Sequence, residues 1–197
     1  MAEIIGYAFA DTETTGLSFL KTDVIEVAFL LDDVDGNALV ELALKINLPE
    51  EYEWTKGAGA IHKISEEDAK THGVSQLDAI KTINATFLRA FGSEGINKVR
   101  MVGANSYFDF VMLQNMYDKN NAGKLPFSHR LIDVNQLGLF LGCGGALSKL
   151  CGYLQIDVDK SQTHGALYDA ELHRKVFYGL LSKCEERGFS FNKNNKA

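Results

Sequence analysis

Three short segments rich in aliphatic, β-branched and aromatic residues lie near the start of the chain, and they constrain the fold more than any other feature. They cover residues 4–10, 23–31 and 38–48, and the turn-forming sequence DDVDGN separates the second from the third. Runs of this length and composition are typical of β-strands. The chain is therefore predicted to begin with a three-stranded meander, which Pro49 ends because proline has no N–H for a sheet hydrogen bond.

Helix signals follow the meander and then alternate with short strands. Ser65 and Ser75 each precede an aspartate by three positions, a pattern typical of helix N-termini. Two short apolar segments, residues 98–103 and 130–133, are predicted as further strands. Further helices are predicted through Tyr117 and over residues 134–141, 146–154 and 165–186. A meander followed by this alternation predicts an α/β sandwich with a mixed sheet.

The length and composition predict one domain. A chain of 197 residues with 46% hydrophobic content can bury one sizeable core, but it is short for two. We expect the domain to cover residues 1–187 and the polar tail, residues 188–197, to be disordered.

Charge and cysteine usage narrow the function classes. The net charge of −6 argues against a protein that binds polyanions through a large basic surface. A nucleic acid can still bind to a small cleft that holds cations, because only the charge within the cleft has to attract it. The three cysteines include no CxxC pair, which predicts a reduced, cytoplasmic chain. No apolar run approaches the roughly 18 residues of a membrane span, so no membrane association is expected.

Asp11 and Glu13 follow the first apolar segment and are one residue apart. Side chains at positions i and i+2 of a strand leave on the same side, so the two carboxylates can converge on one point. Converging carboxylates cost energy unless a cation, a proton or a basic side chain lies between them. Taken alone, an Asp-x-Glu sequence is more often a polar turn that closes a strand.

Further acids and a histidine lie at the starts of two predicted helices. Asp109 begins one of them, where a lone aspartate is more often an N-cap than a ligand. Asp169 lies near the start of the last helix, and His164 is predicted in the loop before it. His173 is interpreted as a surface or packing histidine, and Asp133 as a structural or minor supporting acid.

The segments DTETTGL, NSYFDFVML and HGALYDA, in this order and at these separations, resemble the three motifs of the DEDDh family of 3′→5′ exonucleases. This family includes the proofreading subunit of bacterial replicases and ribonuclease T. The resemblance spans residues 4 to about 181 and implies a ribonuclease H-like, three-layer fold with a mixed five-stranded sheet. The His-x4-Asp spacing favours the histidine branch, because the tyrosine branch would place Tyr at position 165, where this chain has Gly.

The resemblance implies a role for each of these residues. Asp11, Glu13, Asp109 and Asp169 would be metal ligands for two Mg²⁺ or Mn²⁺ ions, and His164 would be the general base. Hard oxygen ligands suit these ions, and paired ions catalyse phosphodiester hydrolysis. The implied reaction releases nucleoside 5′-monophosphates from the 3′ end of DNA or RNA.

The resemblance also implies contacts to the terminal nucleotide. These come from Thr14, Thr15, Gly16, Leu17, His62, Asn105, Phe108 and His164. Leu17 would be wedged against the last base. His62 resembles part of an HGI element, but Lys63 replaces the usual Gly, so this part of the pocket departs from the pattern.

The alternative function is a catalytically silent nucleic-acid-binding or polymerase-associated module of the same fold. The complete set of four carboxylates and His164 favours the enzyme. The expected partner is a nucleic acid with a single-stranded or frayed 3′ end. A polymerase partner and a homodimer remain open, as does the choice between DNA proofreading or repair, RNA trimming, and a viral or mobile-element nuclease.

Overall fold

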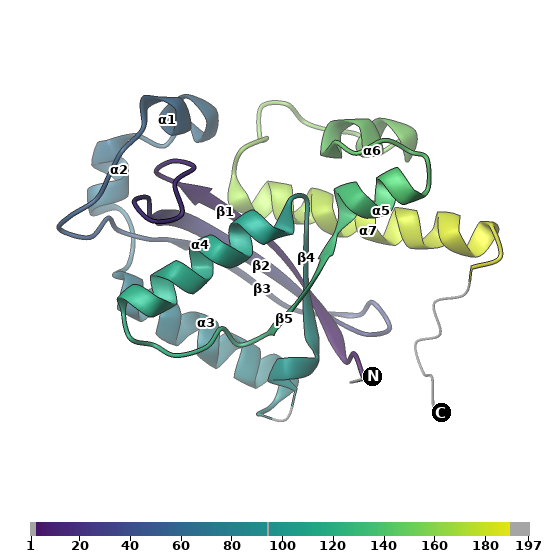
Figure 1. Ribbon diagram of the computed structural model, residues 1–197, viewed down its shortest axis with the longest axis horizontal. Helices are drawn as coiled ribbons and strands as arrows, with labels where there is room; N and C mark the ends of the chain where they lie inside the picture. Colours follow the sequence, from purple (N-terminus) through teal and green to yellow (C-terminus); the bar gives the residue numbers. More distant parts are fainter. Residues whose placement is uncertain (1–2, 94, 190–197) are drawn as a thin grey trace.

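The computed structural model describes residues 3–93 and 95–189, and a five-stranded sheet with helices on both faces forms its centre (Figure 1). The strand order is β3-β2-β1-β4-β5. β1 pairs antiparallel with β2 and β2 with β3, whereas β4 is parallel to β1 and β5 to β4. The strands are β1 (Gly6–Thr14), β2 (Val24–Asp33), β3 (Ala38–Lys45), β4 (Val99–Gly103) and β5 (Ser128–Asp133). The mixed α/β sheet predicted from the sequence is confirmed.

The helices begin and end close to the sequence signals. The Ser65 hydroxyl accepts the Asp68 N–H at the start of α2, and the Ser75 hydroxyl accepts the Asp78 N–H at the start of α3. Gly92 ends α3 with φ 67°, a conformation that glycine adopts at little cost. The helices are α1 (Lys56–His62), α2 (Glu66–Thr71), α3 (Gln76–Phe91), α4 (Ser106–Lys119), α5 (Val134–Phe140), α6 (Leu147–Tyr153) and α7 (Ala166–Glu186), with a 3₁₀ turn over Ile96–Lys98.

Two apolar cores lie on opposite faces of the sheet, so the fold has three layers. Ala8 and Ala10 of β1 pack with α3 and α4, whereas Phe9 between them packs with α7. This alternation follows from the two-residue period of a strand. α5 and α6 complete the layer on the α7 side (Figure 1).

The largest differences from the predicted elements concern β1, β3 and α1. β1 continues to Thr14, beyond the predicted end at residue 10, because β2 keeps pairing with it up to Val24. β3 ends at Lys45, earlier than predicted, and Ile46 forms a parallel bridge with Val74 instead. α1 was not predicted, since Gly57 and Gly59 within it lower helix propensity; the Thr55 side chain caps it.

Residues 190–197 of the predicted tail lie outside the described residues, and the domain limits remain a prediction. Among the helices described, none has the length and apolar character needed to cross a membrane.

Candidate active site

β1 is longer than its neighbour β4, and this difference creates space for the site. β1 pairs with β2 as far as Thr14, but with β4 only over Gly6–Phe9. Beyond Phe9, one edge of β1 therefore has no strand of the described residues beside it. Asp11 and Glu13 lie in this part of β1, within the strand rather than in a turn after it. Because side chains alternate, both carboxylates share the sheet face of Phe9, which α7 covers.

α7 brings a third carboxylate to these two. Asp169 lies in its first turn, and Asp11, Glu13 and Asp169 each offer an oxygen within 4.8 Å of the others. The N-terminal end of a helix carries partial positive charge, which partly compensates a carboxylate placed there. The structure thus brings together three of the four acids that the sequence indicated as ligands.

Asp109, the fourth acid, approaches from the other helical layer. It is buried in the first turn of α4, and its Oδ1 accepts hydrogen bonds from the Thr12 N–H at 2.9 Å and the Thr12 hydroxyl at 2.7 Å. Asp109 is not among the three carboxylates that converge within 4.8 Å, but its charge helps to raise the pKa of Asp11. Sequence reasoning did not single out Thr12, although its place between the two acids of β1 is the signal that could have identified it.

The carboxylates of Asp11, Glu13 and Asp169, here called the acidic cluster, and the carboxylate of Asp109 all resist ionisation. Burial raises the pKa of Glu13 to about 8, and the charges of Asp169, Glu26 and Asp109 add to the shift. Burial raises the pKa of Asp109 to about 7 against the opposing effect of the Thr12 hydrogen bonds. The pKa of Asp11 is raised well above its usual range by burial and then by its acidic neighbours, and burial also raises the pKa of Asp169. Bound divalent cations would offset the cost of ionising these carboxylates. All the donor atoms are oxygens, which fits hard ions such as Mg²⁺.

His164 lies in the loop before α7, as predicted, and its ring is exposed. Its backbone has φ 67°, and its N–H donates to Asp169 Oδ2 at 3.1 Å. The loop is therefore tied to the acidic cluster while the imidazole remains accessible. His164 also lies close enough to His62 for its charge to lower the pKa of that residue, although burial is the larger cause.

His62 is buried at the end of α1. Its Nδ1 accepts the Ile64 N–H at 3.1 Å, so the neutral ring carries its proton on Nε2. Nε2 is buried and makes no hydrogen bond of normal geometry to the described residues, although the Thr14 backbone lies close enough to raise the pKa of the ring. A buried donor without a partner is costly, which makes Nε2 a group that a bound ligand can satisfy.

The end of β1 and the loop after it contain four further predicted substrate contacts, Thr14, Thr15, Gly16 and Leu17. The Thr14 hydroxyl donates to the Gly16 carbonyl at 2.8 Å, and the Thr15 N–H donates to the Asp23 carbonyl at 2.9 Å. A Cβ added to Gly16 would lie 2.7 Å from the Thr55 side chain, so a larger residue would displace the loop. Leu17 projects outward and is 81% exposed, an arrangement that suits a residue expected to touch a base.

Asn105 and Phe108 lie at the start of α4, beside Asp109. Asn105 is exposed with φ 58°, and the Phe108 ring is half-buried with its centroid 5.7 Å from that of Phe19. Both residues therefore lie close to Asp109 at the start of α4, and their role stays a prediction.

Two other residues have the structural roles that the sequence suggested. His173 is buried, its Nδ1 donates to the Ala10 carbonyl at 2.9 Å, and its Nε2 lies 4.0 Å from Asp11 Oδ1. Burial lowers the pKa of His173 to about 4, so it is a neutral packing residue. Asp133 caps α5 by accepting the Asn135 N–H at 2.8 Å.

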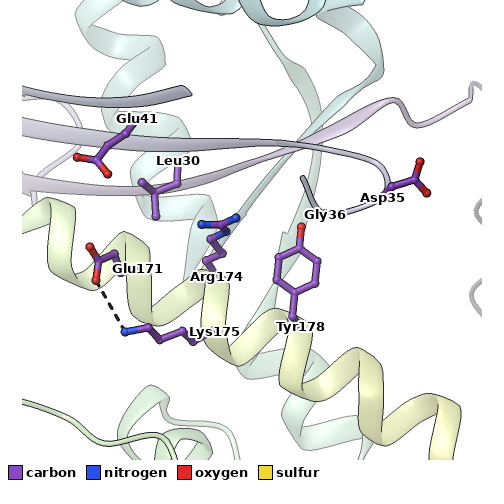
Figure 2. A pocket seen from close by; sticks show the side chains of 8 residues that line it. All are labelled: Leu30, Asp35, Gly36, Glu41, Glu171, Arg174, Lys175 and Tyr178. Atoms are coloured by element: carbon purple, nitrogen blue, oxygen red, sulfur yellow. Dashed lines mark ion pairs between the residues drawn. The ribbon is translucent and has the colours of Figure 1, made fainter. Parts of the chain in front are cut away.

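A pocket of about 510 Å³ lies along α7 and the hairpin of β2 and β3, and it shares no residue with the acidic cluster (Figure 2). Its two basic residues, Arg174 and Lys175, already contact Asp32 and Glu171 at 2.8 and 3.8 Å. Three acidic side chains also line it, namely Asp35, Glu41 and Glu171. This composition does not favour a polyanion, so the acidic cluster remains the candidate site.

Comparison with known proteins identifies the family. The family model RNase_T, described as exonuclease, matches residues 8–177. The chain belongs to this exonuclease family. Ribonuclease T of Wigglesworthia glossinidia brevipalpis is 26% identical over 193 residues, covering 94% of this chain and 89% of the relative. Ribonuclease T of Escherichia coli K12 is 27% identical over 190 residues, covering 90% and 85%.

Solved structures share the exonuclease fold. Exonuclease I of E. coli in complex with a dT13 oligonucleotide superposes with a TM-score of 0.74 at 18% identity, covering 94% of this chain and 42% of that one. A moderately thermophilic Exonuclease I from Methylocaldum szegediense gives a TM-score of 0.75 at 16% identity, with 95% and 42% covered. The chain thus spans less than half the length of these two proteins. The predicted ribonuclease H-like fold and the assignment to the DEDDh type of 3′→5′ exonuclease are confirmed.

Proposed function

We propose that this exonuclease releases nucleoside 5′-monophosphates from single-stranded 3′ ends and that Asp11, Glu13, Asp109 and Asp169 hold two Mg²⁺ or Mn²⁺ ions. The convergence of three buried or half-buried carboxylates within 4.8 Å is the observation that carries the proposal. A protein that only bound nucleic acid would gain nothing from such a repulsive cluster facing a polyanion. Bound ions would lower the pKa of the attacking water and stabilise the negative charge that develops at the phosphate.

The protein groups around the cluster have separate tasks in this proposal. Thr12 holds Asp109 through two hydrogen bonds to Oδ1 and so fixes the orientation of this ligand. Asp109 and Asp169 each lie in the first turn of a helix, α4 and α7, and the helix dipoles partly offset their negative charges.

His164 is the proposed general base. Its exposed ring can reach a water at the scissile phosphate, while its backbone N–H holds the loop against Asp169. A positioned imidazole that accepts a proton from the attacking water typically contributes about 10²- to 10⁴-fold in rate.

The proposed substrate is a chain end because the groups beside the cluster suit a terminal nucleotide. In this proposal the Thr14–Leu17 stretch holds that nucleotide, with Leu17 against its base. The buried Nε2 of His62 is proposed to donate to a sugar or phosphate oxygen. Asn105 and Phe108 are proposed as further sugar or base contacts.

The strandedness of the substrate is supported by relatives. Exonuclease I has been solved with dT13 and dA16 oligonucleotides, and the relatives at 26–27% identity are named ribonuclease T. Both kinds of relative support a nucleic acid with an accessible 3′ end. A cytoplasmic location, a polymerase partner and a homodimer remain predictions.

The proposal is tested with 5′-labelled single-stranded DNA and RNA of the same sequence, each incubated with Mg²⁺, Mn²⁺ or EDTA. We expect a ladder that shortens from the 3′ end with either metal and no cleavage in EDTA. Asp11→Asn should abolish cleavage while the protein stays folded, because the substitution removes a ligand charge but keeps the side-chain shape. Glu41→Gln, an exposed change on β3, is the matched control. Wild-type levels of cleavage by Asp11→Asn would overturn the assignment.

A further inference from the structure

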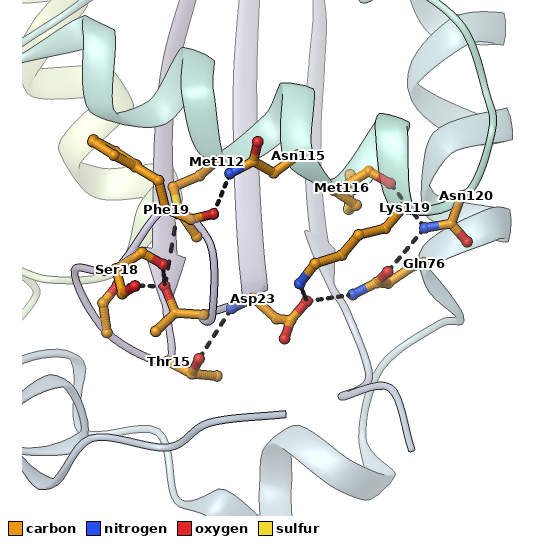
Figure 3. Close-up of polar contacts among 12 residues, drawn as sticks. Thr15, Ser18, Phe19, Asp23, Gln76, Met112, Asn115, Met116, Lys119 and Asn120 are labelled. Carbon is orange, nitrogen blue, oxygen red and sulfur yellow. Dashed lines mark hydrogen bonds and ion pairs between the residues drawn. The ribbon is translucent and has the colours of Figure 1, made fainter. Parts of the chain in front are cut away.

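One face of α4 connects the proposed metal ligand to the loop that follows β1. Asp109, Met112, Asn115 and Lys119 are spaced three or four residues apart, so they form one stripe along the helix. The last three all contact residues 15–23. The Asn115 side-chain amide donates to the Phe19 carbonyl, the Met112 sulfur lies 4.0 Å from the Thr22 hydroxyl, and Lys119 Nζ lies 2.7 Å from Asp23 Oδ1 (Figure 3).

Asp23 closes the base of this loop. Its carbonyl accepts the Thr15 N–H at 2.9 Å, and its own N–H donates to the Thr15 hydroxyl at 3.0 Å. Its side chain is only 2% exposed, and besides Lys119 it accepts the Gln76 amide at 3.2 Å. Asn120 in turn donates to the Gln76 carbonyl oxygen at 2.9 Å, as Figure 3 shows. A buried carboxylate with these partners is costly to displace, so the two ends of the loop stay together.

The loop is compact within this frame. The Thr22 hydroxyl lies 2.7 Å from the Ser18 carbonyl and 3.0 Å from the Gly16 carbonyl, and the Thr22 N–H donates to the Ser18 carbonyl at 3.0 Å. Leu17 and Leu20 are 81% and 88% exposed. Polar groups of the loop therefore bond within it and to α4, and Phe19 packs against Phe108, whereas Leu17 and Leu20 face outward, where a nucleotide would lie.

We propose that Asn115 and Lys119 are positioning residues that set the register between the terminal nucleotide and the metal ligands. They act through the Phe19 carbonyl and the Asp23 carboxylate, and this inference rests on the proposed function of the Thr14–Leu17 stretch. Asp109 lies on the same stripe of α4, so this one rigid helix both carries a proposed metal ligand and anchors the loop. Loss of either anchor should therefore loosen the loop that binds the terminal nucleotide, while the metal ligands themselves stay in place.

The alternative is that these contacts only stabilise the fold. Steady-state kinetics distinguishes this structural role from a positioning role. We compare Asn115→Ala and Lys119→Met with wild type on a single-stranded oligonucleotide in Mg²⁺. Lys119→Arg is the conservative variant, and Lys81→Met, which breaks an exposed ion pair with Asp78 on α3, is the matched control.

Positioning predicts a KM about 10-fold higher for both truncations, with kcat within about threefold of wild type, because terminal-nucleotide binding is weakened more than the chemistry. Mn²⁺ affinity, measured by calorimetry without substrate, should be unchanged. Lys119→Arg should recover most of the lost affinity, and Lys81→Met should behave as wild type. Unchanged KM values, or a fall in kcat with a matching loss of Mn²⁺ affinity, would overturn the inference.

Amide hydrogen exchange tests the same inference without activity. In both truncations, residues 15–23 of the metal-free protein should exchange faster than in wild type, while residues 109–114 of α4 keep their protection. Identical exchange in residues 15–23 would refute the anchoring. An inactive wild type with faster loop exchange in the variants would instead refute the proposed function and leave the anchoring intact.

Discussion

Glu13→Gln should stabilise the metal-free protein above neutral pH, because Glu13 is a buried acid held among other acids. Its pKa rises from 4.5 to about 8, first through burial and then through the charges of Asp169, Glu26 and Asp109. At about 1.4 kcal/mol for each pH unit, this shift corresponds to a penalty of about 5 kcal/mol once Glu13 is fully ionised. The cost of ionised Glu13 is smaller if the carboxylates move apart or if water enters between them. We therefore expect Glu13→Gln to raise the free energy of unfolding by about 2 to 5 kcal/mol.

The sign of the pH dependence follows from proton binding. Between about pH 4.5 and 8 the folded state keeps the Glu13 proton while the unfolded state loses it. The contribution of this group to stability is therefore fully present below pH 4.5 and falls as the pH rises towards 8. Glu13→Gln removes this dependence, so the two proteins should differ little at pH 5 and most at pH 8.5.

Urea unfolding in EDTA, followed by circular dichroism at pH 5, 7 and 8.5, measures the effect. Glu41→Gln removes one exposed carboxylate from β3 and is the matched control for a simple change in net charge. Mg²⁺ should raise the stability of the wild type at pH 8.5 and that of Glu13→Gln much less, because ion binding to the folded state stabilises it. A difference between wild type and Glu13→Gln that stays the same at all three pH values would refute the proposed charge repulsion.

Two further substitutions test individual groups of the site. His164→Ala should lower kcat by about 10²- to 10⁴-fold with little change in KM, measured by steady-state hydrolysis of a single-stranded oligonucleotide, and an equal loss in substrate binding would indicate a binding role instead. Thr12→Val keeps the shape of β1 but removes the hydroxyl that donates to Asp109 Oδ1 at 2.7 Å. It should weaken Mg²⁺ activation about 10-fold, seen as a shifted Mg²⁺ titration of activity, whereas Thr82→Val on α3 should leave the titration unchanged.

Local patterns in the sequence predicted the elements of the fold well. The serine caps of α2 and α3, the glycine that ends α3, and the shared direction of Asp11 and Glu13 each depend on residues within a few positions of one another. α1 escaped prediction because Gly57 and Gly59 oppose helix formation in isolation, and it forms with a Thr55 cap and a packed His62.

The contacts that orient the site could not be predicted in this way. Thr12 and Asp109 are 97 positions apart, and Lys119 lies 96 positions from Asp23. No periodicity relates such residues, and only the assembled sheet and α4 bring them together. The resemblance to exonucleases named the ligands, but it contained no information on how Asp109 is held or on what secures the loop.

The unequal lengths of β1 and β4 explain how acids from both helical layers can meet. Within a continuous sheet, Asp11 and Asp109 would be separated, since Asp11 faces the α7 layer while Asp109 belongs to the α4 layer. β4 ends at Gly103, so the first turn of α4 lies beside the unpaired edge of β1. A Cβ at Gly103 would lie 3.1 Å from the Ala10 carbonyl, tighter than an ordinary contact, so a larger residue there pushes β1 and the start of α4 apart by a few tenths of an ångström. Substitution of Gly103 by valine should therefore separate Asp109 from Thr12 and weaken metal binding more than it disturbs the pairing of β1 with β2.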